Sequence, residues 1–227
     1  EAFRIRANKN ADAKVKMAKK ALAYIEPGDV VLLDCSTSSW FLARQMPDIE
    51  ITALTTSLNT IHALECKSNI RVIGLGGMYS GKYESFSGPL TERIITEFNV
   101  DKLFFSCHGI SLINGIRERD ENQARLKQAM ISVSEKSILL CDSSKIDVNS
   151  FCKVCDYDKI DILITDLLPS DEYRSEMGWN NVKVIETKPS EVVNDILEII
   201  QYTEKSFVIK GNTKPIKELL VRLGGKW

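Results

Sequence analysis

The hydrophobic pattern of the chain changes its period repeatedly. Short runs that are apolar at nearly every position alternate with longer segments in which apolar residues recur every three or four positions. The short runs are typical of strands buried on both faces of a parallel sheet, and the longer segments predict amphipathic helices. The predicted strands are residues 30–33, 51–54, 70–75, 102–107, 137–141, 161–165 and 182–185.

Helical segments precede and separate these strands. Residues 10–25 and residues 120–134 each bring apolar side chains to one face of a helix. We expect the basic side of the first helix to face water, although such a face also suits a nucleic acid. Strand and helix thus alternate, which predicts an α/β fold with an open, mostly parallel sheet and helices on both faces. The apolar positions are Val15, Ala18, Leu22, Ile25, Leu126, Ala129, Met130 and Val133, and the basic ones are Lys14, Lys16, Lys19 and Lys20.

The pattern changes near residue 188, where we place a domain boundary. Residues 1–187 are the predicted main domain, and residues 188–227 are a small C-terminal βα extension. Residues 207–211 predict a strand and turn, and Pro215 opens a helix. The extension is either a small module with a partner of its own or a tail that packs on the main domain. A further helical face is predicted from Val193, Ile196, Leu197 and Ile200.

Composition and charge narrow the class of protein. Apolar residues make up 44% of the 227 residues, and no apolar run approaches the roughly 18 residues of a membrane span, which predicts a soluble, cytoplasmic protein. The net charge of −1 argues against a stand-alone nucleic-acid binder, because proteins that neutralise phosphates are usually basic. The chain starts at Glu1 without a signal peptide, which favours a piece excised from a longer protein.

The cysteines and glycines predict neither a metal site nor a nucleotide cofactor. A chain of this length needs no disulfide framework, so we expect its six cysteines to be reduced. Cys152 and Cys155 have the spacing of a zinc knuckle, but there is no second such pair, and His62 and His108 are the only histidines. No dinucleotide-binding glycine motif and no phosphate loop of the Walker type follows the first strand.

Small, hydroxylated or charged residues follow nearly every predicted strand. In an open parallel sheet, ligands bind outside the carboxyl ends of the strands, where loops present N–H groups and helices begin. Hydroxyls, glycines and helix N-termini suit phosphate oxygens, a lysine adds positive charge, and carboxylates accept hydrogen bonds from sugar hydroxyls. The candidate ligand-binding residues are Asp34, Ser36, Thr37, Ser38, Ser39, Thr55, Thr56, Ser57, Gly76, Gly77, Gly88, His108, Gly109, Asp142 and Lys145.

A simpler interpretation exists for several of these residues. Serine and threonine are favoured N-cap residues at strand-to-helix turns, so Ser38 and Thr56 fit plain capping roles. His108 likewise fits a turn as well as it fits an acid or base. The recurrence of such residues at five strand ends favours a shared ligand site over five separate caps.

These motifs together resemble the effector-binding domain of DeoR-type bacterial transcriptional repressors. The resemblance covers residues 10–187 and is carried by GDVVLLDCSTSS, ALTTSLNTIHAL, VIGLGGMYSGKYESFSGP, VDKLFFSCHGI and LCDSSKIDVNSF. Two places depart from the family pattern: Ser36 stands where the family has glycine, and Thr55-Thr56 stands where it has Thr-Asn. The pattern is kept at Asp34, Thr37, Gly76, Gly77, Gly88, Asp101, Asp142 and Lys145.

The resemblance implies a fold similar to ribose-5-phosphate isomerase and a role as a sensor. In such repressors a phosphorylated sugar binds this domain and changes the DNA affinity of an oligomer through an N-terminal helix-turn-helix domain, which this sequence lacks. An effector of this kind must bind two conformations with different affinity. The alternative is an isomerase or deaminase of sugar phosphates, whose proton transfer needs a carboxylate base and a cation. The residues available for that chemistry are Asp142, Lys145, Glu118 and Asp120.

Overall fold

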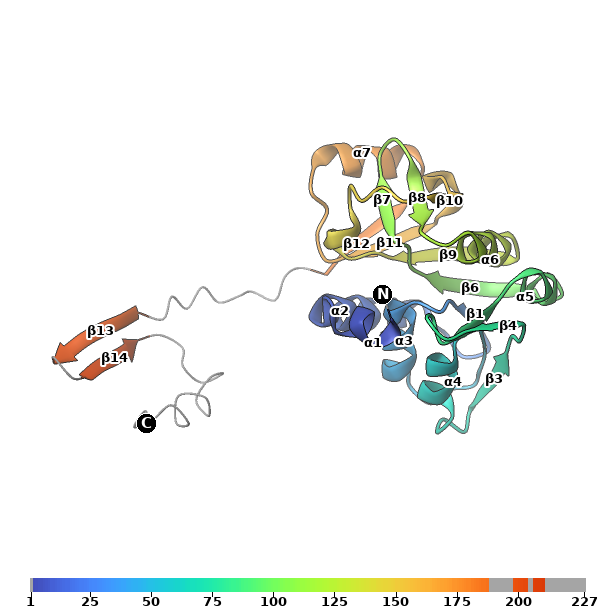
Figure 1. Ribbon diagram of the computed structural model, residues 1–227, viewed down its shortest axis with the longest axis horizontal. Coiled ribbons are helices and arrows are strands. Elements are labelled where there is room, and N and C mark those ends of the chain that lie inside the picture. Colours follow the sequence, from blue (N-terminus) through green and yellow to red (C-terminus); the bar gives the residue numbers. More distant parts are fainter. Residues whose placement is uncertain (1, 188–197, 204–205, 211–227) are drawn as a thin grey trace. The chain divides into compact units, whose positions relative to one another are not determined.

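The structure, a computed structural model, describes residues 2–187, 198–203 and 206–210 (Figure 1). The chain divides into two compact units, residues 1–187 and 188–227. The first unit carries every candidate ligand-binding residue. Each unit is considered by itself.

A parallel sheet forms the centre of the first unit. Its order across the described residues is β12-β11-β9-β6-β1-β2-β3, and each neighbouring pair runs parallel. The predicted open, parallel α/β sheet is therefore confirmed. All of the strands predicted up to residue 187 are present in it. They are β1 (Val30–Leu33), β2 (Ile51–Thr55), β3 (Ile70–Gly74), β6 (Val100–Phe105), β9 (Ser134–Leu140), β11 (Ile162–Thr165) and β12 (Lys183–Glu186).

The two faces of this sheet bury separate hydrophobic clusters. Along β1, Leu32 faces one cluster, whereas Val31 and Leu33 face the other, because successive side chains of a strand point to opposite sides. Helices α2, α3 and α4 cover the face of Val31, and α5, α6 and α7 cover the face of Leu32 (Figure 1). Burial on both faces explains why the strands are apolar at consecutive positions.

The two helices predicted in this unit, residues 10–25 and 120–134, are present as α2, followed by a short 3-10 turn, and as α6. Ser36, Ser57 and Asp120 cap α3, α4 and α6, since each side chain accepts a hydrogen bond from the backbone N–H three residues later. The short helix α1 has no counterpart in the sequence prediction. The bounds are α1 Phe3–Asn8, α2 Ala11–Ala21, α3 Thr37–Gln45, α4 Leu58–Leu64, α5 Pro89–Ile95, α6 Glu121–Ser132 and α7 Asp171–Trp179.

Two small antiparallel sheets were also missed by the sequence prediction. Their strands are three to four residues long, which is too short to show a clear period. The hairpin β4–β5 packs over the loop after β2, where Phe86 N–H donates to the Thr56 carbonyl at 2.9 Å and Leu58 N–H to the Glu84 carbonyl at 3.0 Å. The strands are β4 (Met78–Ser80) and β5 (Ser85–Ser87) in one sheet, and β7 (Gly109–Ser111), β8 (Gly115–Glu118) and β10 (Cys152–Cys155) in the other.

The second unit contains an antiparallel pair, β13 (Glu198–Thr203) and β14 (Ser206–Lys210). The strand predicted at residues 207–211 is confirmed as β14. The helical face predicted to run through Ile200 is wrong at that residue, since Ile200 lies in β13 and pairs with Val208. Ile196 and the helix expected from Pro215 lie outside the described residues.

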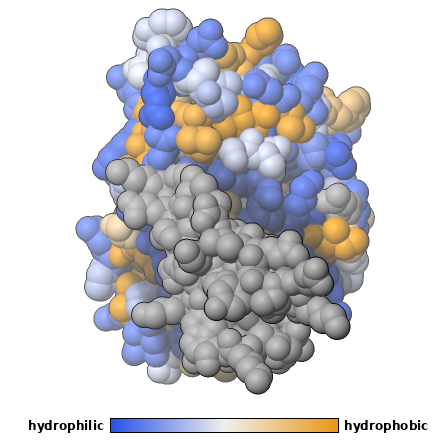
Figure 2. Space-filling model, turned by 90° about the vertical axis from the view of Figure 1, so that its left-hand side faces the viewer, coloured by the Kyte–Doolittle hydropathy of each residue, from blue (hydrophilic) through white to orange (hydrophobic). Residues whose placement is uncertain are grey.

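The part of the first unit that Figure 2 shows carries both hydrophobic and hydrophilic residues at its surface. Among the described helices, none has the length and apolar character needed to cross a membrane. All six cysteines carry free thiols, and four of them, including Cys35 and Cys107, are buried.

Candidate ligand-binding site

The strand order fixes where a ligand site forms. From β1 the chain builds outward through β2 and β3 on one side, and later through β6, β9, β11 and β12 on the other. The connections that leave the carboxyl ends of the neighbouring strands β1 and β6 therefore lead to opposite sides of the sheet, and ligands of open α/β sheets bind in the crevice at such a point. A cavity of about 250 Å³ lies there, lined by Ser36, Cys107 and Asp142 from the ends of β1, β6 and β9.

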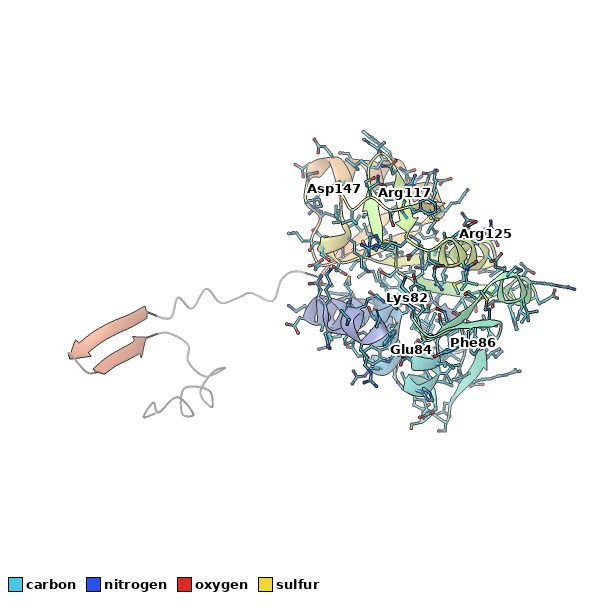
Figure 3. All side chains as sticks on the ribbon, viewed as in Figure 1. Lys82, Glu84, Phe86, Arg117, Arg125 and Asp147 are labelled. Atoms are coloured by element: carbon cyan, nitrogen blue, oxygen red, sulfur yellow. The ribbon has the colours of Figure 1, made fainter. Side chains whose placement is uncertain are left out.

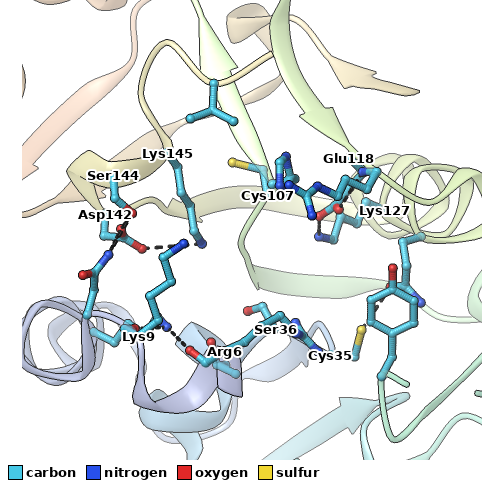
Figure 4. A pocket seen from close by; sticks show the side chains of 18 of the residues that line it. Arg6, Lys9, Cys35, Ser36, Cys107, Glu118, Lys127, Asp142, Ser144 and Lys145 are labelled. Carbon is cyan, nitrogen blue, oxygen red and sulfur yellow. Dashed lines mark hydrogen bonds and ion pairs between the residues drawn. The ribbon is translucent and has the colours of Figure 1, made fainter. Parts of the chain in front are cut away.

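Segments distant in the sequence complete the walls of this cavity. Lys82 comes from the β4–β5 hairpin, which reaches towards the middle of the unit, whereas Arg117 and Arg125 lie farther out (Figure 3). Figure 4 shows Arg6, Lys9 and Ser36 on one side, and Asp142, Lys145, Glu118 and Lys127 on the opposite side. The lining residues are Arg6, Lys9, Asn10, Lys14, Cys35, Ser36, Thr37, Lys82, Tyr83, Cys107, His108, Glu118, Arg119, Gln123, Lys127, Asp142, Ser144, Lys145 and Val148.

The cavity is strongly cationic although the whole chain is nearly neutral. Within the described residues, lysines and arginines provide seven of the lining side chains, whereas Glu118 and Asp142 provide the carboxylates. The chain as a whole carries a formal charge of −1. Positive charge is thus concentrated where the sheet topology places a ligand, and a low-dielectric cleft strengthens its attraction for an anion.

Lys127 forms the buried floor of the cavity. Its Nζ lies 3.4 Å from Asp34 Oδ2, donates to the Ser106 carbonyl at 2.6 Å and pairs closely with Glu118. Burial opposes the charge on Lys127, but Glu118 and Asp34 outweigh it and raise the pKa of this lysine above its ordinary value. Lys127 therefore stays protonated, and its charge is largely neutralised by its own carboxylates.

Asp34 has a structural position just below the cavity. It is 1% exposed, and its carboxylate accepts hydrogen bonds from the Ser36 N–H, the Ser39 hydroxyl and the Ser106 N–H at 3.1, 2.6 and 3.0 Å. These contacts join the loop after β1 to the end of β6. Asp34 consequently shapes the loop that presents Ser36 and Thr37 to the cavity.

Lys145 and Asp142 face each other after β9. Their Nζ and Oδ2 atoms are 3.7 Å apart, and Lys145 also donates to the Ser106 hydroxyl at 2.7 Å. Burial lowers the pKa of Lys145, but Asp142 together with the smaller contributions of Cys107 and Cys141 outweighs this effect, so the pKa of Lys145 is raised. The pKa of Asp142 is lowered despite its burial, because Lys145 and hydrogen bonds from Ser144 and Asn10 stabilise the carboxylate.

The N-terminal segment closes one side of the cavity. Asn10 adopts a left-handed conformation (φ 53°) between α1 and α2, which asparagine tolerates better than most residues. Its amide donates to Asp142 Oδ1 at 2.9 Å and to the Ser144 hydroxyl at 2.8 Å. These bonds fasten the α1–α2 junction to the loop after β9.

The expectation that all lysines of helix α2 face water is wrong for Lys14. Its side chain is 4% exposed, lines the cavity, and donates to the carbonyls of Arg6 and Lys9, both at 2.5 Å. Burial, reinforced by the positive charge of Lys145, lowers the pKa of Lys14 to about 8. Lys16, Lys19 and Lys20 do not line the cavity.

Two side chains that line the cavity have buried donors without hydrogen-bond partners. Gln123 is 3% exposed; its Oε1 accepts a hydrogen bond from the Cys35 thiol at 3.0 Å, whereas its Nε2 has no partner. Arg6 has buried Nε and Nη2 atoms, also without hydrogen-bond partners. Buried polar groups nearly always find partners in native proteins, so these donors favour a ligand that accepts hydrogen bonds.

The structure brings five of the candidate residues to the cavity: Ser36, Thr37, His108, Asp142 and Lys145. The candidate residues after β2 do not line the cavity, because the β4–β5 hairpin covers their loop. The candidate glycines after β3 do not line it either, and Gly77 packs tightly against Thr91. Gly88 is the N-cap residue before α5, and Gly109 packs against Val148. The remaining candidates, none of which lines the cavity, are Asp34, Ser38, Ser39, Thr55, Thr56, Ser57, Gly76, Gly77, Gly88 and Gly109.

Most of the cationic lining was missed at the sequence level. Arg6, Lys9, Lys82, Arg119 and Lys127 follow no strand of the predicted sheet. For Lys127, a signal was available: it interrupts the apolar side of the helix at residues 120–134, next to Leu126. The others carry no local signal, because exposed lysines and arginines occur throughout the chain.

The fold and the cavity define an α/β binding domain with a cationic site at the edge of its sheet. The family model described as "DeoR C terminal sensor domain" matches residues 9–167. This match covers well over half of the chain, and the chain belongs to the family of DeoR C-terminal sensor domains. The resemblance stated from the motifs is thereby confirmed.

Curated relatives are transcriptional regulators. The chain is 42% identical over 164 residues to the "L-fucose operon activator" of Haemophilus influenzae, a match that covers 72% of this chain and 66% of that protein. It is 38% identical over 183 residues to the "Uncharacterized HTH-type transcriptional regulator YulB" of Bacillus subtilis, covering 81% and 68%. The matched region thus spans about two thirds of these relatives.

Solved structures give a more distant likeness. Ribose 5-phosphate isomerase A from Methanocaldococcus jannaschii aligns with a TM-score of 0.44 and 16% identity, covering 61% of this chain and 55% of that one.

Proposed function

We propose that residues 1–187 are the effector-sensing domain of a transcriptional regulator of sugar metabolism and bind a phosphorylated sugar. The observation that carries the proposal is the concentration of cationic side chains around a cavity at the carboxyl ends of β1, β6 and β9. A phosphate supplies the negative charge that such a site favours. Two findings support a sugar as the rest of the ligand. The chain belongs to the sensor family, and the relative in Haemophilus influenzae is named an L-fucose operon activator.

The two ends of such a ligand fit different parts of the cavity. Ser36 and Thr37 lie at the start of α3, where N–H groups and the helix dipole favour a phosphate. Asp142, Glu118 and the Gln123 amide offer acceptors and donors to sugar hydroxyls. Ser36 occupies the family's glycine position, and its own hydroxyl already accepts the Ser39 N–H at 3.1 Å.

We also propose that DNA is bound by a separate domain and not by residues 1–187. The relative from Bacillus subtilis is named an HTH-type regulator, and the present chain matches about two thirds of it. The sequence predicts a repressor, whereas the relative from Haemophilus influenzae is named an activator. A reporter gene measured with and without the regulator decides the sign of the regulation.

An isomerase activity receives less support from the site. Asp142 is paired with Lys145, and Glu118 with Lys127. The lowered pKa of Asp142 makes it a weak base, and the raised pKa of Lys145 keeps the amine protonated. Turnover of ribose 5-phosphate or glucosamine 6-phosphate above background would contradict a purely sensory role.

A thermal-shift panel tests the proposed function. Sugar phosphates, including phosphate esters of L-fucose, are compared with the corresponding free sugars, and calorimetry confirms each shift. A ligand at 100 times its Kd stabilises by about 2.7 kcal/mol, or roughly 5 to 10 °C for a domain of this size. A shift with one phosphorylated sugar supports the proposal, and silence across the panel contradicts it.

Assembly into an oligomer stays a prediction. Light scattering coupled to gel filtration, with and without the sugar phosphate that shifts the melting temperature, measures it directly. A monomer under both conditions would show that the oligomer is not a property of this chain.

A further inference from the structure

The helix α1 presents an unusual arginine to the cavity. Arg6 places its Nε and Nη2 atoms out of contact with water and without a hydrogen-bond partner. These nitrogens form one edge of the guanidinium group, and this edge binds two oxygens of a phosphate or carboxylate in parallel. Leaving such donors unpaired costs free energy, so their burial beside a cavity is explained when a ligand supplies the acceptor.

Aromatic rings fix the position of the Arg6 side chain. The guanidinium carbon lies 5.6 Å from the ring centre of Phe3 and 5.3 Å from that of Tyr83. Stacking of this kind leaves the edge of the guanidinium group available for hydrogen bonding. Arg6 and Tyr83 both line the cavity, so the unpaired edge and the site share one space.

The surrounding charges also favour an anion next to Arg6. Lys9 lies on the same side of the cavity as Arg6, and Lys145 lies across it (Figure 4); Lys14 also lines the cavity. The Lys14 amine gives hydrogen bonds to the carbonyls of Arg6 and Lys9, which ties the end of α1 to the site. Among the described residues, no acidic side chain forms a salt bridge with Arg6 within 4.0 Å.

We propose that Arg6 binds the phosphate of the ligand through its Nε–Nη2 edge, and that this contact holds α1 on the sensor domain. The proposal rests on the proposed function and names a residue outside the matched family region, which begins at residue 9. Apart from Arg6, α1 is held by Phe3, whose ring packs edge-on against Trp40 with a centroid distance of 5.6 Å, by the buried Ala7, and by the hydrogen bonds from Lys14 to its C-terminal end. A helix of only six residues gains protection from exchange when a further contact forms.

The experiment compares Arg6→Met with the matched variant Arg4→Met in the full chain. Arg4 lies on the same helix, is exposed and does not line the cavity. Calorimetry measures Kd for inorganic phosphate and for the sugar phosphate with the largest thermal shift. We expect Arg4→Met to bind as the wild type does, Arg6→Met to bind roughly 10- to 100-fold more weakly, and Arg6→Lys to lie between them.

Two further readouts separate binding from a merely structural role. Without phosphate, Arg6→Met should melt no lower than Arg4→Met, because it removes buried donors that have no partner. With phosphate, the amides of residues 3–8 should exchange more slowly in the wild type and in Arg4→Met, but not in Arg6→Met.

The outcomes distinguish this inference from the proposed function. If the wild type binds a phosphorylated ligand and Arg6→Met binds it within about twofold of Arg4→Met, a difference of less than about 0.5 kcal/mol, the role of Arg6 is refuted and the sensor function stands. If the wild type binds neither phosphate nor any sugar phosphate, both proposals fail. If exchange of residues 3–8 is unchanged on binding while Arg6→Met weakens affinity, Arg6 is a ligand contact and the holding of α1 is refuted.

Discussion

Replacement of Lys127 by methionine tests the charge arrangement beneath the cavity. The change keeps most of the aliphatic side chain of this buried residue on α6 but removes the ammonium group. Asp34 then loses its only cationic neighbour among the described ion pairs, and Glu118 loses its close partner. Because Asp34 is 1% exposed, water cannot replace the lost charge without opening the loop after β1.

The expected loss of stability follows from this burial. Removing one partner of a buried ion pair typically costs about 3–5 kcal/mol, because the other charge is left uncompensated. The hydrogen bonds that Asp34 retains from Ser36, Ser39 and Ser106 place the expected value near the lower limit. At roughly 2–4 °C per kcal/mol for a domain of this size, the melting temperature should fall by roughly 6–12 °C.

Urea unfolding followed by circular dichroism measures the change, with Lys136→Met as the control. Lys136 is exposed on β9 and forms none of the described ion pairs, so its replacement should alter the free energy of unfolding by less than about 0.5 kcal/mol. If the free energy of unfolding of Lys127→Met lies within about 0.5 kcal/mol of that of the control, the inferred compensation of the Asp34 charge by Lys127 is refuted.

The remaining predictions concern pH, backbone packing and salt. Lys14 has a pKa of about 8, so phosphate affinity should fall as the pH rises through 8, and calorimetry should find no such fall in Lys14→Met. The pKa of Lys14 in the folded protein lies below the ordinary value of 10.5, so the unfolded chain binds more protons between these two pH values. The contribution of Lys14 to stability should therefore rise with pH over that window. It is measured as the free energy of unfolding of the wild type minus that of Lys14→Met. Gly109→Ala should lower the melting temperature and weaken ligand binding, because the added methyl carbon would lie 2.0 Å from the carbonyl oxygen of Val148, a cavity residue; Gly178→Ala, which meets no atom within 4 Å, is the control. Lys145→Ala should weaken phosphate binding more at about 0.05 M salt than at about 0.5 M, because salt screens part of the attraction; equal losses at both would contradict a direct charge contact.

Much of the fold was predictable from the chain because its signals are local. The consecutive apolar residues of Val30–Leu33 and Ile162–Thr165 report burial on both faces of a sheet, whatever the neighbouring strands are. The short strands of β4 and β7 were not predictable in this way. Their hydrogen bonds depend on loops that fold back onto the main sheet, and three residues are too few to show a period.

The candidate site was predictable only in part. Asp142 and Lys145 follow a strand in the sequence, and they do line the cavity. Thr55 and Thr56 follow a strand equally well, yet the β4–β5 hairpin covers their loop. Both pairs carry the same local signal, so a single rule could not separate them.

The sequence by itself determined the α/β class, the positions of the main strands and the family, because apolar periodicity and motif spacing are properties of neighbouring residues. Only the tertiary structure decided which strand ends meet, because the order of strands in the sheet depends on pairing between distant segments. It also decided that Arg6, Lys14 and Lys127 converge on one cavity in a chain of almost zero net charge. A charge acts through space with a strength that depends on burial and distance, and neither quantity can be read along the chain.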